Sequence, residues 1–206
     1  YGAMSFDDML CDFLDTPEVQ RLRWIKQLGL ANLVYPSATH DRFSHTLGVT
    51  YLAKQLCNVL GIPKDETDII CVSAIVHDVG HTGFSHTLEY VLEKYLGKNH
   101  MTLLGDMLRG RIPTYPEGVE KPKTQTLVDI LEKYGFDAGE IADIVIGKHR
   151  KAYVGEIIHG GVDVDTIDYL LRDTHFTGIP AGTIDIDRLM QVLSIHDGHL
   201  VVIQKG

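Results

Sequence analysis

The sequence has no long hydrophobic run. A membrane-spanning helix needs about 18 or more consecutive apolar residues, and the 206 residues contain no such stretch. The N-terminal region also lacks the basic segment followed by an apolar one that marks an export signal. These two absences argue against a membrane partner, and they lead us to expect a cytoplasmic protein.

Cysteine is scarce, and basic residues are outnumbered. Cys11, Cys57 and Cys71 are odd in number and share no C-x-x-C spacing, which argues against a disulfide framework and a zinc-thiolate site. The 19 Lys and Arg residues face 28 Asp and Glu residues, for a net charge of −9. Duplex nucleic acid is therefore not an expected partner, because neutralising phosphates needs a concentrated basic face. Small anions can still bind where basic groups gather locally.

The chain has enough hydrophobic residues to form one core. They make up 44% of the sequence, and its length is typical of a single domain. Helical periodicity and capping residues recur along the chain. Loops are predicted at 30–44 and 109–125, and a short strand within 198–206. The predicted helices lie at residues 15–29, 45–60, 65–78, 86–97, 100–108, 126–134, 138–148 and within 160–178. We therefore predict an all-α bundle with a short C-terminal strand.

Histidine is abundant, with eleven residues, and it clusters in the segment "HDVGHTGFSH". His77 and Asp78 end a predicted helix and lie roughly 100° apart around its axis, so both can reach one ion beside the helix. Alone, a His-Asp pair is more often a hydrogen-bonded pair or a helix cap.

Further candidate ligands stand at the starts of two other predicted helices. His45 begins one of them, and Asp163 and Asp165 stand at the start of the other. With the His-Asp pair, His45 and one of these aspartates complete a set of two imidazoles and two carboxylates. Such a set suits one divalent ion of Fe, Mn, Mg or Zn.

Three long stretches carry a family resemblance: "QRLRWIKQLGLANLVYPSATHDRFSHTLGV", "HDVGHTGFSH" and "GVDVDTIDYLLRDTHFTGI". They resemble the HD superfamily of metal-dependent phosphohydrolases, in particular the deoxynucleoside triphosphate (dNTP) triphosphohydrolase branch with its sterile-alpha-motif-and-HD-domain enzymes. The resemblance implies an all-helical HD-domain bundle that hydrolyses a dNTP to deoxynucleoside and inorganic triphosphate. We expect a single HD phosphohydrolase domain over residues 1–206, lacking the C-terminal lobe of relatives, either as a truncated chain or as a minimal member.

The same resemblance implies the metal ligands, which are His45, His77, Asp78 and Asp165. It also implies that Arg42 contacts the substrate phosphates. A guanidinium offers a fixed fork of donors to phosphate oxygens, whereas a solvated arginine paired with Asp41 is the simpler alternative. Relatives often carry a lysine where this chain has Thr166, so one phosphate contact of the family is expected to be absent.

The catalytic residues implied by the resemblance are His81, Glu89 and His100. A carboxylate that binds one imidazole nitrogen fixes the tautomer and raises the pKa of the ring, so His81 could protonate the leaving 5′-oxygen. Relatives usually have the shorter aspartate where this chain has Glu89. His86 also matches an active-site histidine, and a core histidine bonded to a carbonyl is the alternative.

A sugar-binding end is predicted on the helix that starts at Asp165. Asp165, Tyr169 and Asp173 are spaced i, i+4 and i+8, so they share one face over two turns. The resemblance implies that Tyr169 and Asp173 contact the deoxyribose and that Gln27 and Leu28 line it. An ordinary core tyrosine is the alternative for Tyr169.

A second nucleotide site is implied by matches at Asp15, Gln20, Arg23 and Arg188. In the family these positions bind an activating nucleotide at subunit interfaces, which requires a homo-oligomer. An ordinary helix cap with surface polar residues is the alternative.

Two other functions stay open. One is an HD phosphohydrolase of another nucleotide, such as a nucleoside monophosphate, a cyclic nucleotide or (p)ppGpp. The other is a catalytically silent nucleotide-binding regulator. The complete set of expected ligands and catalytic residues favours an enzyme that acts on a dNTP.

Overall fold

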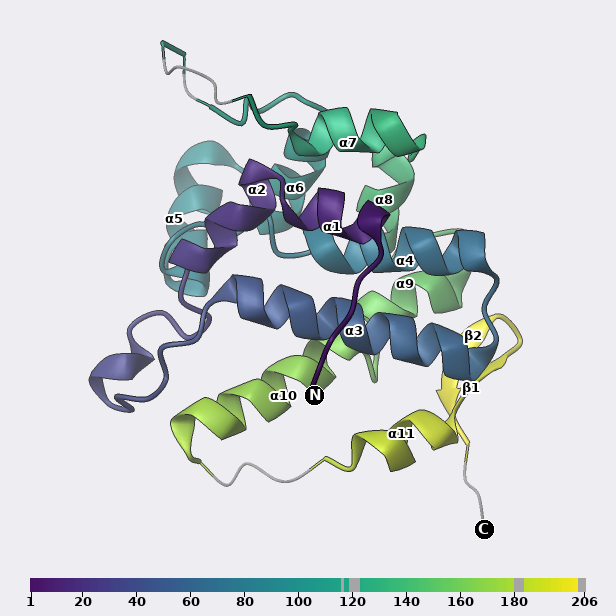
Figure 1. Cartoon of the computed structure of the whole chain (residues 1–206). Helices are drawn as coiled ribbons and strands as arrows, with labels where there is room; N and C mark the ends of the chain where they lie inside the picture. The colour runs from purple at the N-terminus through teal and green to yellow at the C-terminus, as the bar shows by residue number, and fades with distance from the viewer. Residues whose placement is uncertain (116, 119–122, 180–183, 204–206) are drawn as a thin grey trace.

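A computed structural model describes residues 1–115, 117–118, 123–179 and 184–203. For residues 85–87 it describes the backbone but not the side chains. Helices dominate this part of the chain, which confirms the predicted all-α class (Figure 1). In chain order the elements are α1 (Asp8–Leu14), α2 (Pro17–Gln20), η1 (Arg21–Trp24), η2 (Ala31–Leu33), α3 (Arg42–Leu60), α4 (Lys64–Val76), α5 (Ser85–Leu96), α6 (His100–Leu108), α7 (Leu127–Tyr134), α8 (Ala138–Val145), α9 (Ala152–Ile158), α10 (Val164–Thr177), α11 (Ile186–Val192), β1 (Leu193–His196) and β2 (His199–Val202). Within the described residues, no helix has both the length and the apolar character needed to cross a bilayer.

Helices α3 and α4 pack against each other in the middle of the molecule (Figure 1). The chain enters α3 where the Asp41 carboxylate accepts a hydrogen bond from Ser44 N at 2.8 Å, and it leaves at Gly61, which takes the left-handed conformation with φ 66°. Every residue of α4 from Ile70 to Val76 is buried, as expected of a central helix.

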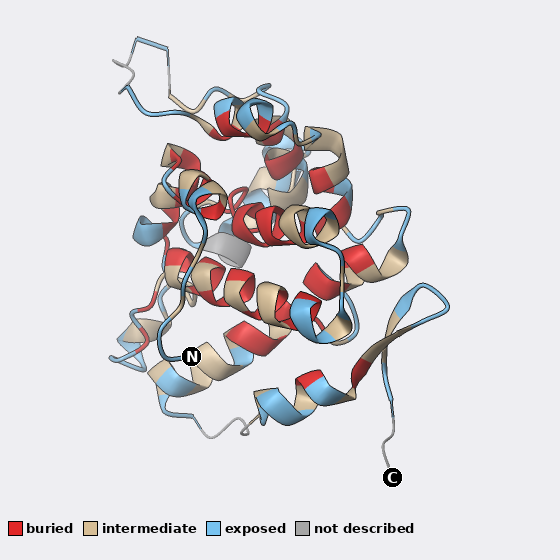
Figure 2. Cartoon of the chain, turned by 45° about the vertical axis from the view of Figure 1, so that its right-hand side comes forward, coloured by how far each residue is buried: buried red, intermediate tan, exposed pale blue. Residues whose placement is uncertain are grey.

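Two apolar clusters lie on the two sides of this central pair. One joins α4 to α1, α6, α7 and α8, and the other joins α3 and α4 to α9, α10 and α11. Buried residues accordingly concentrate along the central helices in Figure 2, while the outer faces are exposed. The central pair is thus held from both sides, which makes it a rigid base for side chains at its ends.

The predicted C-terminal strand is confirmed as β2, and it pairs antiparallel with β1. The turn between them consists of Asp197 and Gly198, both with positive φ (50° and 80°), which is the conformation that an Asp-Gly hairpin turn requires. Strand β1 was not predicted, because it follows α11 without an intervening loop.

The helix predicted at residues 15–29 is wrong. The chain forms only α2 and η1, of four residues each, and becomes extended at Ile25 (φ −109°, ψ 111°). There the Ile25 carbonyl accepts from Arg42 N at 2.9 Å, and Gln27 N donates to the His40 carbonyl at 3.1 Å. These distant backbone partners replace the helical hydrogen bonds, a tertiary effect that local periodicity does not reveal.

Other element boundaries also differ from the prediction. The loop assigned to 30–44 ends earlier, because Asp41 caps a helix that already begins at Arg42. Three helices of seven residues each, α1, α9 and α11, were not predicted. Short helices of this size carry a weak periodic signal and depend on packing for their stability.

Candidate metal centre and substrate cavity

His45 lies in the first turn of α3 and is fully buried. Its Nε2 atom is 3.0 Å from Asp165 Oδ1 and 4.0 Å from Asp78 Oδ2. Its other ring nitrogen, Nδ1, is 2.7 Å from Asp168 Oδ2. The imidazole is therefore held from behind at Nδ1 and presents Nε2 to the carboxylates.

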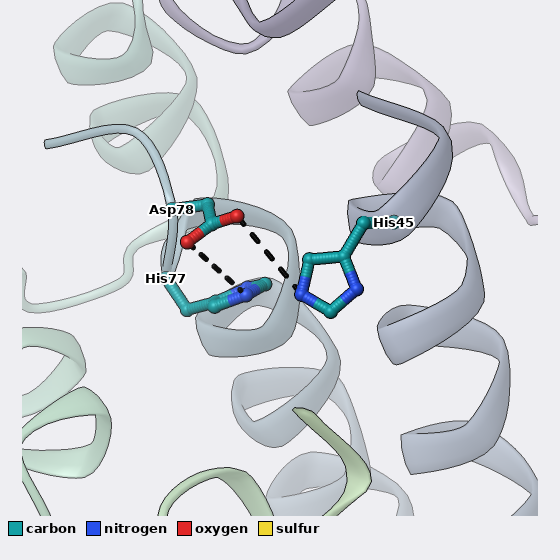
Figure 3. A group of neighbouring side chains, drawn as sticks. All are labelled: His45, His77 and Asp78. Carbon is teal, nitrogen blue, oxygen red and sulfur yellow. Dashed lines mark ion pairs between the residues drawn. The ribbon is translucent and has the colours of Figure 1, made fainter. Parts of the chain in front are cut away.

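His77 stands in the turn directly after α4. Its Nδ1 donates to the Ala74 carbonyl at 2.7 Å, so Nε2 carries the lone pair. That Nε2 atom is buried and has no hydrogen-bond partner among the described residues. Figure 3 shows the imidazoles of His45 and His77 converging on the carboxylate of Asp78, and the ligand atoms of these three residues all lie within 4.8 Å of one another.

The two aspartates at the start of α10 have different partners. Asp163 is the N-cap, and its carboxylate accepts from Thr166 N and Gly160 N at 2.7 and 2.8 Å. Asp165, in the first helical turn, instead reaches His45. The cluster accordingly takes in Asp165, while Asp163 holds the helix start.

These side chains fit a divalent metal ion. Two imidazole nitrogens and carboxylate oxygens are donors that such ions accept. A buried ring nitrogen with a lone pair and no donor opposite it costs free energy, and a cation at that position would offset the cost. The orphaned Nε2 of His77 is therefore the observation that best supports a metal here.

The residues of the cluster shift one another's pKa values. Burial raises the pKa of Asp78, but its neighbours His77, Arg42 and His81 lower it well below its usual range, and Arg42 Nη1 lies 2.7 Å from Asp78 Oδ2. Burial lowers the pKa of His45, whereas hydrogen bonds to Asp165 and Asp168 raise it, to about 10. Because a metal ligand must be a neutral imidazole, a metal ion at Nε2 would displace a proton from His45.

Behind His45 lies a layer of residues that the sequence reasoning missed. The side chain of Asp168 is fully buried and bonded to Arg172 through both oxygens, at 2.8 and 2.9 Å, and to the Tyr1 hydroxyl at 2.6 Å. Helix α10 approaches α3 closely here, since a Cβ on Gly48 would stand 1.8 Å from Asp168 Oδ1. The i, i+4 spacing of Asp168 and Arg172 was the available signal.

The predicted catalytic histidines are brought together. The rings of His81 and His100 stack with centroids 4.1 Å apart and planes 14° apart. His81 Nε2 lies 3.3 Å from Asp78 Oδ1, and Glu89 is bonded to His100 Nδ1. The carboxylate thus holds the second imidazole of the stack. The side chain of His86 lies outside the described residues.

Two features of the backbone shape this stack. Gly80 has no room for a Cβ, which would stand 2.0 Å from the His100 carbonyl, so only glycine allows the turn to meet the start of α6. Arg21 donates to the carbonyls of Val79 and His81 at 2.6 and 2.9 Å and so fixes the turn from the other side.

An open cavity of about 390 Å³ lies in front of the cluster. It brings together the predicted phosphate and sugar residues with three of the four predicted metal ligands, all but His45, and it adds Met101 and His159, which the sequence reasoning missed. Its lining consists of Gln27, Leu28, Arg42, His77, Asp78, His81, His100, Met101, His159, Asp165, Tyr169 and Asp173. The three residues of α10 spaced i, i+4 and i+8 therefore do line one space.

Of the four residues predicted for a second nucleotide site, three lie close together and Arg188 lies apart. Arg23 Nε donates to Gln20 Oε1 at 2.7 Å, and Gln20 donates to the Leu14 carbonyl beside Asp15 at 2.8 Å. Arg188 is exposed on α11, on the far side of the molecule from α2 (Figure 1). One chain does not assemble the set, so a shared site would need a second copy, and its existence stays a prediction.

Comparison with known families bears on the site directly. The model of the HD domain family matches residues 42–173, a range that begins at Arg42, ends at Asp173 and contains all four predicted metal ligands. The chain belongs to the HD domain family.

Relatives of this HD chain are found in archaea and eukaryotes. An uncharacterised protein of Methanocaldococcus jannaschii is 36% identical over 91% of this chain and 35% of its own length. The deoxynucleoside triphosphate triphosphohydrolase SAMHD1 homolog of Dictyostelium discoideum is 30% identical over 100% of this chain and 40% of its own length. This HD chain therefore spans less than half the length of the curated relatives it matches.

Solved structures agree with the fold. A hypothetical protein from Aquifex aeolicus superposes with a TM-score of 0.79 at 31% identity, over 96% of this HD chain and 50% of that one. A phosphohydrolase from Bacteroides thetaiotaomicron superposes with a TM-score of 0.74 at 28% identity, over 93% and 44% respectively.

Proposed function

We propose that this HD domain hydrolyses a deoxynucleoside triphosphate to the deoxynucleoside and inorganic triphosphate. The carrying observation is one cavity that is lined by His77, Asp78 and Asp165 and, two helical turns beyond Asp165 on α10, by the carboxylate of Asp173. His45 is buried directly behind this wall, with its ligand atom within 4.8 Å of those of His77 and Asp78. The name of the Dictyostelium relative, whose similarity extends over the whole of this chain, supports the choice of substrate.

The phosphate end of the substrate fits the end of the cavity at the metal cluster. A divalent ion held by His45, His77, Asp78 and Asp165 would supply a Lewis acid and an activated water there. Arg42 is buried, fixed by Asp78 and part of the cavity wall. Its permanent positive charge offsets phosphate charge beside the reacting centre.

The proposed reaction breaks the bond between the α-phosphorus and the 5′-oxygen. A water oxygen bonds to the α-phosphorus and gives up one proton to solvent. The electron pair of the broken bond stays on the 5′-oxygen, and that oxygen takes a proton from a side-chain acid to become the deoxynucleoside hydroxyl. His81 lines the cavity next to Asp78 and is the proton donor in this scheme. Its stack with His100, which Glu89 holds, fixes the ring orientation.

The sugar end is formed by Tyr169 and Asp173 on α10, with Gln27 and Leu28 on the facing segment. A carboxylate accepts hydrogen bonds from hydroxyl groups, and a tyrosine ring covers the apolar face of a sugar. This end therefore suits a deoxyribose.

Product analysis tests the proposal. The purified protein is incubated with Mn, Fe or Mg and each of the four common dNTPs, and the products are separated by ion exchange. We expect inorganic triphosphate and deoxynucleoside in equal amounts from at least one dNTP. Release of orthophosphate alone would instead indicate a phosphohydrolase of another nucleotide, and binding without any turnover would indicate a regulator.

A further inference from the structure

His40 is a buried histidine at the sugar end of the cavity. Its side chain has no exposed surface, and its Nε2 atom lies 2.7 Å from Asp173 Oδ1. Asp173 keeps 24% of its side-chain surface and lines the cavity. Since Asp173 is eight residues beyond Asp165 on α10, this contact stands about 12 Å along the helix from the metal cluster.

The orientation of the ring is fixed by its surroundings. His40 stacks on Phe176 with centroids 4.6 Å apart and planes 17° apart, and Ser37 on the same loop donates to the Phe176 carbonyl. The second ring nitrogen, Nδ1, is buried with no hydrogen-bond partner among the described residues. The hydrogen therefore sits on Nε2, because a buried Nδ1–H would lack an acceptor while Nε2 faced a carboxylate lone pair.

One short segment serves both ends of the cavity. Residue 41 is extended, with φ −113° and ψ 167°, so His40 and Arg42 project to the same side of the backbone. Arg42 holds Asp78 at 2.7 Å, and His40 holds Asp173 at 2.7 Å. Backbone hydrogen bonds to Ile25 and Gln27 fix this segment in place.

We propose that His40 is the positioning residue for substrate recognition by Asp173. It donates to Oδ1 and keeps the carboxylate turned so that Oδ2, which makes no hydrogen bond to the described residues, meets the 3′-hydroxyl of the substrate. This inference rests on the proposed function and adds to it the residue that orients the sugar-reading carboxylate.

Two variants separate the hydrogen bond from the packing. His40→Phe keeps a ring against Phe176 and removes the unpaired Nδ1, but it leaves Asp173 without its donor. His40→Gln keeps an amide donor at about the reach of Nε2. We expect His40→Phe to raise KM for the dNTP about tenfold with a smaller change in kcat, as for one lost hydrogen bond to a charged group. His40→Gln should recover most of that loss.

A substrate without the 3′-hydroxyl makes the test specific. With a 2′,3′-dideoxynucleoside triphosphate the wild type should show a raised KM, and His40→Phe should add nothing to it. Ser37→Ala, which removes the other link between this loop and α10, is the control and should keep the wild-type KM. Metal content should be equal in all variants.

Several results would overturn the inference. An unchanged KM in His40→Phe, an equal loss on the dideoxy substrate, or the same loss in Ser37→Ala would each show that His40 only pins the loop. Should His40→Phe fail to fold, His40→Asn carries the same expectation, because its amide reaches only the Nδ1 position. A wild type that releases triphosphate from no dNTP would refute the proposed function, and the inference with it.

Discussion

His45 Nδ1 lies 2.7 Å from Asp168 Oδ2, and this contact ties the imidazole of a proposed metal ligand to a fully buried carboxylate. Asp168 is itself held by Arg172 and Tyr1. Hydrogen bonds of this kind orient a ligating histidine and fix which nitrogen faces the ion. The proposed metal centre would therefore depend on residues that do not line the cavity.

Replacement of Asp168 by Asn should weaken metal binding about 10- to 100-fold, because the orienting charge behind His45 is lost. The measurement is a metal titration of the purified variant. Asp187→Asn, a like change at an exposed position of α11, is the control. Unaltered metal affinity in Asp168→Asn would mean that metal binding does not depend on the negative charge beside His45 Nδ1.

His77→Ala should abolish metal retention and turnover, since it removes the orphaned ligand atom. It leaves the Arg42–Asp78 pair intact, so the fold should survive. We expect metal affinity to fall by at least about a hundredfold, more than for loss of a supporting residue. Elemental analysis after dialysis measures this, with the exposed His175→Ala as control. Full metal content in His77→Ala would remove His77 from the ligand set.

Gly48→Ala should destabilise the protein even though alanine favours helices over glycine by about 1 kcal/mol. The added Cβ would stand 1.8 Å from Asp168 Oδ1, and relief of such a clash costs about 1–3 kcal/mol. Urea unfolding measures the difference. At Gly161 a Cβ meets nothing within 4 Å, so Gly161→Ala should be near neutral. Equal stability of the two variants would show that α10 can move away from α3 at little cost in free energy.

The ion pair of Glu66 with Lys151 should make stability depend on pH. Hydrogen bonds from Lys151 and Tyr153 lower the pKa of Glu66 below its ordinary 4.5. A group with a lowered pKa in the folded state stabilises the protein above the unfolded pKa, and this contribution disappears as pH falls through the folded pKa.

Glu66→Gln should therefore lower Tm at pH 7, and its difference from wild type should shrink towards pH 3. Thermal unfolding at several pH values measures the trend. Asp65→Asn removes a charge from the same helical turn at an exposed position and should change Tm less. A Tm difference for Glu66→Gln that stays constant down to pH 3 would contradict the assignment.

The sequence was most informative where a signal is local. His77 and Asp78 are adjacent, and the i, i+4, i+8 spacing of Asp165, Tyr169 and Asp173 places all three along one cavity. Helix α4 was recognisable because it is apolar on nearly every side. Such features depend on a few neighbouring residues, and neighbouring residues keep their geometric relation in any helix.

Local signals failed where a distant partner decides the conformation. The helix expected at 15–29 gives way at Ile25, whose carbonyl bonds to Arg42 N. Residue chemistry alone left Asp163 and Asp165 equivalent, and only the family resemblance favoured Asp165. In the structure Asp163 caps α10, whereas Asp165 reaches His45.

The amino-acid sequence by itself therefore determined the helical class, the chemistry of the ligands and the face of α10 that carries them. Tertiary structure alone decided which buried groups form hydrogen bonds with the residues that line or surround the cavity. Asp168 is 123 residues from His45, and Asp173 is 133 residues from His40. Each of these pairs forms only when the packing of α10 against α3 and its preceding loop brings buried polar groups within hydrogen-bond distance, and that packing depends on the whole core.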